Sequence, residues 1–167
     1  NTITARREYK VVKEWDKNLE ENEFADISQV LFKLERRSTR DKADGSLADY
    51  EVVKNGTGDT ASEVWQIAKE EGRTWKTTIQ DLPKYDAEGY VYYYRATEIG
   101  FINQDGKTIT LEDTSKNRNW SVRYYRTPEQ TKIVNWRLTE DGTSYIFVTK
   151  LWQDNGDEVK DGETRKN

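Results

Sequence analysis

The stretch Glu8-Tyr9-Lys10-Val11-Val12-Lys13-Glu14-Trp15 determines the fold class, because core-type side chains recur at every second position. Tyr9, Val11 and Trp15 fall on one face of an extended strand, and Lys13 falls on the same face. This period of two predicts a β-strand with one side turned to a hydrophobic core. A lysine within such a face is chemically unusual, because burial disfavours its charged form.

The same alternation recurs in short runs over residues 27–36, 74–82, 89–99, 108–111, 120–125 and 131–138. Each run is bounded by a turn signal, among them Asp44-Gly45, Asn55-Gly56, Glu88-Gly89, Asp105-Gly106 and Asp141-Gly142. Several short strands at this spacing predict an all-β sandwich.

Two stretches depart from the strand pattern. Residues 62–71 place Val64, Ile67 and Ala68 at helical spacing, which predicts a short helix. Residues 38–61 are rich in Asp, Ser, Thr, Gly and Lys and have the character of an inserted, solvated loop. The expected fold is therefore a β-sandwich that carries a short helix or a long loop insertion.

Composition narrows the function classes. The 167 residues include no cysteine and no histidine, which excludes disulfides and the imidazole-dependent nucleophiles, and disfavours zinc. Scattered aspartates lack the spacing of a calcium loop, so we expect no metal and no cofactor. The net charge of −4 argues against nucleic acid as a partner, and no apolar run is long enough for membrane insertion. Six Trp, ten Tyr and four Phe supply an aromatic core despite a hydrophobic content of only 34%.

One internal repeat is visible. Residues 11–18 (VVKEWDKN) resemble residues 148–155 (VTKLWQDN), with valine, lysine, tryptophan and asparagine in common. Chance likeness between two strands is the alternative interpretation. The repeat predicts a tandem array, with residues 1–140 as one domain and 141–167 as a linker plus the first strand of a following repeat. The missing initiator methionine predicts an excised fragment or a processed product.

Four stretches together resemble the collagen-adhesin B-type (Cna B-like) domain. They are Val11-Val12-Lys13-Glu14-Trp15-Asp16, Leu82-Pro83-Lys84-Tyr85-Asp86-Ala87-Glu88-Gly89, Tyr94-Arg95-Ala96-Thr97-Glu98 and Ile133-Val134-Asn135. The second and third form the more specific match. The sequence departs from the pattern at Ala96, where valine is commoner, and at Trp136, where a small polar residue is usual. Residues 37–72 are also longer than the family leads us to expect.

The resemblance implies an immunoglobulin-like sandwich of inverse topology in a Gram-positive surface adhesin or pilin. It implies a structural stalk domain, secreted and anchored to the cell wall, whose partners are neighbouring repeats of the same chain. It also implies an autocatalytic isopeptide bond between Lys13 and Asn135, promoted by Glu98, and no enzymatic activity beyond that single turnover. Lys150 would be the corresponding lysine of the next repeat, without a bond in this chain.

The residues support that chemistry independently of the resemblance. Lys13, Glu98 and Asn135 each share the phase of apolar neighbours on their own strands, so all three can be buried. Burial favours a neutral amine, which is a nucleophile, and a protonated carboxyl, which can donate to the asparagine carbonyl. The sandwich would hold amine and amide in contact, which supplies the effective concentration that free groups lack.

Other interpretations of these residues stay open. Lys13 could extend to solvent, Asn135 could lie at an edge or turn, and Glu98 could pair with Arg95 or Lys132. The alternative reactive groups are Lys10, Asn103, Asn117 and Asn119. At the level of function, the alternatives are an adhesin module whose 38–72 insertion or aromatic face contacts a host matrix protein or glycan, and an accessory module of a carbohydrate-active enzyme.

Overall fold

The computed structural model describes residues 4–111 and 120–137. Nine strands dominate these residues, together with the four-residue helix α1 (Glu21–Phe24) and the 3₁₀ turn η1 (Gly58–Thr60). The strands are β1 (Arg6–Trp15), β2 (Ile27–Ser38), β3 (Glu51–Val53), β4 (Trp65–Ala68), β5 (Thr74–Pro83), β6 (Tyr92–Asn103), β7 (Thr108–Thr110), β8 (Trp120–Arg126) and β9 (Gln130–Arg137).

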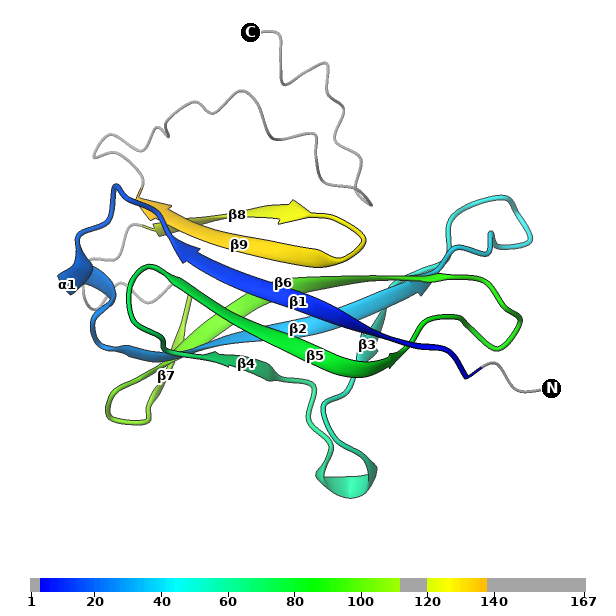
Figure 1. Ribbon diagram of the computed structural model, residues 1–167, viewed down its shortest axis with the longest axis horizontal. Helices are drawn as coiled ribbons and strands as arrows, with labels where there is room; N and C mark the ends of the chain where they lie inside the picture. The colour runs from blue at the N-terminus through cyan, green and yellow to red at the C-terminus, as the bar shows by residue number, and fades with distance from the viewer. Residues whose placement is uncertain (1–3, 112–119, 138–167) are drawn as a thin grey trace, which may run out of the picture.

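The strands form two sheets that pack face to face (Figure 1). One sheet has the order β5-β1-β9-β8, and the other has the order β3-β2-β6-β7 with β4 also paired to β2. Within the described residues the strands pair antiparallel, except that β1 and β9 run parallel side by side. The all-β sandwich expected from the alternating runs is confirmed.

The helix expected over residues 62–71 is wrong, because this segment contains β4. Ile67 is fully buried and pairs with Val30 of β2, whereas Gln66 and Ala68 on either side are exposed. The environment therefore alternates with a period of two. The edge of β2 provides backbone partners for a segment too short to form a stable helix on its own.

The insertion over residues 38–61 is exposed for most of its length, as expected for a solvated loop. It also contributes to the sheet, because β3 pairs with β2 between Leu34 and Arg36. Together with β4, the insertion therefore extends the edge of the second sheet.

The core lies between the sheets and is mainly aromatic. Trp15 stands at its centre, stacked on Phe24 at 4.7 Å between ring centroids and edge-on to Trp75 and Trp120 at 5.4 and 5.2 Å. Such rings bury a large area per residue, which explains how a chain with few aliphatic residues fills a sandwich. Burial along β1 alternates as the sequence predicts, and Lys13 lies on the buried face.

Candidate functional site

The side chain of Lys13 is enclosed in the core. The residue is fully buried, and its Nζ donates a hydrogen bond to Glu98 Oε2 at 2.5 Å. The same nitrogen lies 4.1 Å from the ring centroid of Trp15 and 5.3 Å from that of Phe101. The amine thus contacts one carboxylate and two aromatic rings, and it is shielded from solvent.

A bulge in β6 places the acid. Leu31 pairs with Gly100 and Phe32 pairs with Glu98, so β6 has one residue more than β2 at this point. Because of the extra residue, Glu98 and Phe101 both face the core although they are three positions apart. Both side chains then meet the Lys13 amine, one as its partner and the other as part of its enclosure.

Asn135 lies on the strand beside Lys13. In the parallel pairing of β1 with β9, Lys13 is opposite Ile133 and Trp15 is opposite Asn135. Lys13 and Asn135 are therefore diagonal neighbours on the inner face of one sheet, about two residues apart along the strands. The lysine amine lies over the ring of Trp15, the residue directly opposite Asn135.

The carboxamide of Asn135 is nearly inaccessible, with 1% of the residue exposed. Its Nδ2 donates to the Ser121 carbonyl oxygen at 3.2 Å across the β8–β9 pair, which fixes the orientation of the amide. Within the described residues, Asn135 Oδ1 and Glu98 Oε1 are both buried and lack hydrogen-bond partners. A buried acceptor without a hydrogen-bond partner is energetically unfavourable, and this site holds two of them.

The environment of Lys13 weakens its hold on a proton. Burial lowers the pKa of the Lys13 amine from its ordinary 10.5 to about 8, although the attraction of Glu98 acts in the opposite direction. A lysine in this state is a far better nucleophile than a surface lysine, because a larger fraction is neutral. A strongly shifted buried lysine beside a carboxyl is also the type of group that marks a functional site.

The alternative groups lie elsewhere. Lys10 is exposed on the opposite face of β1, Arg95 pairs with Glu35 at 3.0 Å, and Lys132 pairs with Glu14 at 3.1 Å. Asn103 caps a turn by accepting from the backbone of residues 105 and 107. Asn117, Asn119, Lys150 and the proposed boundary near residue 140 lie outside the described residues.

Several residues around the site were not singled out from the sequence. Phe101 encloses the amine, the Ser121 carbonyl orients the amide, and the Tyr124 hydroxyl accepts a hydrogen bond from the Glu98 backbone N–H at 2.9 Å. Ser121 contacts the amide through its backbone carbonyl, so the identity of its side chain could not reveal this role from the sequence. Tyr124 is in the inward phase of β8, but the same phase fits any core tyrosine.

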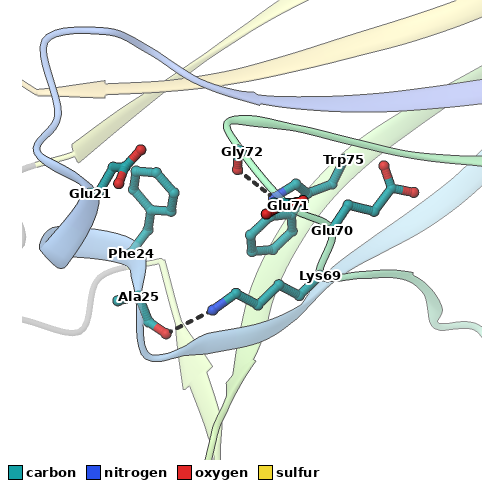
Figure 2. Close-up of a pocket in the computed structure, with 8 residues that line it drawn as sticks. All are labelled: Glu21, Phe24, Ala25, Lys69, Glu70, Glu71, Gly72 and Trp75. Carbon is teal, nitrogen blue, oxygen red and sulfur yellow. Dashed lines mark hydrogen bonds between the residues drawn. The ribbon is translucent and has the colours of Figure 1, made fainter.

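Two cavities open near the core. One, of about 240 Å³, is lined by Asn135 together with Leu111, Trp120, Ser121 and Val122. The other, of about 200 Å³, lies between α1 and the β4–β5 turn, where Figure 2 shows Phe24 and Trp75 with Glu21, Glu70 and Glu71.

Polar groups at the second cavity satisfy one another. Lys69 Nζ donates to the Ala25 carbonyl oxygen at 3.1 Å, and Trp75 Nε1 donates to the Gly72 carbonyl oxygen at 3.0 Å. Its acids lie at the exposed rim.

Among the residues that the structure describes, no cluster of three or more acidic side chains could hold a metal ion, and no helix has the length and apolarity to span a membrane. No family model matches the chain, and no match is found among curated proteins or among solved structures.

Proposed function

We propose that this chain is a structural domain that joins Lys13 to Asn135 through an isopeptide bond of its own making. The observation that carries the proposal is a fully buried lysine, 2.5 Å from a buried glutamate, on the strand next to a buried asparagine. Nothing about folding requires this set, because a buried ion pair is weak support for stability compared with an apolar core.

The reaction follows from the positions of the groups. Lys13 passes its proton to Glu98, and the neutral amine attacks Cγ of Asn135. The protonated Glu98 donates to Asn135 Oδ1, which becomes the oxyanion and otherwise lacks a partner among the described residues. The attacking nitrogen then gives up one proton, which Glu98 relays to Nδ2; the Cγ–Nδ2 bond breaks, Nδ2 leaves as ammonia, and an amide joins the two side chains. One amine and one carboxamide are converted into one amide and one ammonia.

The topology gives such a bond a mechanical use. Because β1 and β9 are parallel neighbours, the start of β1 and the end of β9 lie at opposite ends of the sheet (Figure 1). Tension on the two ends would pass through the Lys13–Asn135 amide and would bypass residues 14–134. This suits a stalk or spacer domain of a surface adhesin or pilus-type protein, the role that the Cna B-like resemblance and its inverse immunoglobulin-like topology imply.

Intact mass spectrometry of the denatured full chain tests the proposal. We expect a mass lower than the sequence mass by one ammonia, and fragmentation should locate a branched peptide joining Lys13 to Asn135. The variants Lys13→Ala, Asn135→Ala and Glu98→Ala should have the full mass. Lys10→Ala is the matched control, because it removes an exposed lysine from the same strand and should keep the deficit.

Two results would overturn the proposal. One is a full sequence mass for the wild-type chain after folding. The other is a deficit that survives Lys13→Ala, which would assign the lost ammonia to another reaction such as succinimide formation.

A further inference from the structure

Tyr124 makes an unusual contact with the strand that carries the acid. Its hydroxyl oxygen, on β8 in one sheet, accepts the backbone N–H of Glu98, on β6 in the other sheet, at 2.9 Å. A strand N–H normally pairs with a neighbouring strand. The contact is therefore a hydrogen bond between the two sheets, at the residue that acts as the acid in the proposed reaction.

The contact forms where the edge of β6 has no strand partner among the described residues. There β2 pairs along one side of β6, whereas β7 pairs along the other side from Gly100 to Ile102. Upstream of that pairing, side chains from the opposite sheet take its place. Thr131 Oγ1 accepts the Ala96 N–H at 3.1 Å, and Arg126 Nη2 donates to the Ala96 carbonyl oxygen at 2.9 Å.

Tyr124 also belongs to the hairpin that carries the electrophile. In the β8–β9 pairing, Val122 is opposite Asn135 and Tyr124 is opposite Ile133, on the same inner face. One hairpin therefore carries both the amide on the strand beside Lys13 and the hydroxyl that contacts the Glu98 backbone.

We propose that Tyr124 is the positioning residue of the bond-forming site: its hydroxyl fixes Glu98 when the β8–β9 hairpin docks, so acid and amide are aligned together. The inference rests on the proposed isopeptide chemistry. It adds Tyr124, whose hydroxyl contacts the Glu98 backbone and not the reacting side-chain atoms. Burial, helped by the nearby Glu98 charge, raises the pKa of the Tyr124 hydroxyl to about 12. The hydroxyl therefore stays neutral in the range where the bond would form.

The test is the rate of bond formation in the full chain. Unfolded chain recovered in urea is diluted into buffer, and intact mass is followed with time for the loss of one ammonia. We expect Tyr124→Phe to slow this loss by about tenfold or more, because one buried N–H loses its acceptor and the acid loses its anchor. Phenylalanine keeps the ring that lies under the Arg126 guanidinium at 4.2 Å.

Thr131→Val is the matched control. It removes another buried hydroxyl, which accepts the backbone N–H of Ala96, two residues before Glu98, and also hydrogen-bonds the Tyr9 hydroxyl at 2.8 Å; the side-chain shape is almost unchanged. If Tyr124 acts by positioning the acid, Thr131→Val should keep the rate within about threefold of wild type at a comparable loss of stability. Equal slowing by both variants would reduce Tyr124 to a structural contact and overturn the inference.

The pH profile gives a readout that a structural role would not move. The reaction needs one proton shared between Lys13 and Glu98, so the rate should fall as the pair loses that proton above pH about 8. Glu98 raises the pKa of Lys13, so a loosened Glu98 lets the proton leave earlier. Tyr124→Phe should move this descending limb to lower pH by about half a unit or more, while Thr131→Val leaves it in place.

The measurements distinguish a failure of the proposed function from a failure of the positioning role. If wild type never loses ammonia, the proposed function fails. If wild type links and Tyr124→Phe links at the same rate with the same pH profile, only the positioning role fails. Should Tyr124→Phe not fold, hydrogen exchange in the unlinked Asn135→Ala chain decides, because the Glu98 amide must be protected and its rapid exchange would overturn the inference.

Discussion

Two ion pairs of the sandwich differ in how far they are exposed to solvent, and therefore in what they contribute to stability. Arg36 of β2 and Glu51 of β3 pair at 2.8 Å with side chains 23% and 57% exposed, whereas Lys13 and Glu98 pair at 2.5 Å with both side chains at 0%. In the first pair water screens the charges, and the attraction changes little on folding. In the second, both groups have lost their hydration, which is unfavourable unless the contact compensates.

The difference shows which pair is present for a reason other than stability. A surface pair can form or break with little consequence, so its presence says little. A buried pair on the inner faces of two sheets, next to a buried amide, occupies space that apolar side chains would fill more favourably. We therefore interpret the Lys13–Glu98 pair as a reactive pair enclosed in the core, in contrast to the Arg36–Glu51 pair at the surface.

The largest effect is expected from breaking one half of the buried pair. In the unlinked Asn135→Ala chain, Glu98→Leu should lower the free energy of unfolding by about 3–5 kcal/mol, because Lys13 is left buried without a partner. Urea unfolding measures the change. Replacing both partners in the same background, with Lys13→Met added, should recover most of the loss or exceed the starting stability. A loss below about 1 kcal/mol for Glu98→Leu would place this pair with the surface pairs.

The next effect is a dependence of stability on pH. The pKa of Lys13 is about 8 in the folded chain and 10.5 in its ordinary state, so between these values the unfolded chain binds more protons. The free energy of unfolding of Asn135→Ala should therefore rise with pH across this window, by up to about 3 kcal/mol. Other groups titrate there too, so the comparison is with Lys13→Met/Asn135→Ala, which lacks this contribution. Parallel curves for the two chains would contradict the prediction.

The smallest effect is expected at the surface. Glu51→Gln removes the charge opposite Arg36 and should change the free energy of unfolding by less than about 1 kcal/mol, with no effect on the mass of the linked chain. Urea unfolding at low and high salt measures it, and added salt should shrink the difference further. A loss as large as that of Glu98→Leu would remove the contrast between the two pairs.

Alternation along the chain predicted much of the fold and the phase of the site. A period of two identified β1, β2, β5, β6, β7, β8 and β9 and placed Lys13, Glu98 and Asn135 on inward faces, because side-chain direction in a strand is a local property. The same reasoning failed at residues 62–71. Val64, Ile67 and Ala68 fit a helical spacing, and only pairing with β2 decides for a strand.

The sequence by itself thus determined which side chains could be buried, since periodicity depends only on neighbours in the chain. The tertiary structure decided which buried groups meet. The parallel pairing of β1 with β9 sets Lys13 diagonal to Asn135, the bulge in β6 turns both Glu98 and Phe101 inward, and the open β6 edge brings Tyr124 to the acid. These contacts join strands far apart in the chain, and their register comes from packing two sheets around one core, which no local pattern encodes.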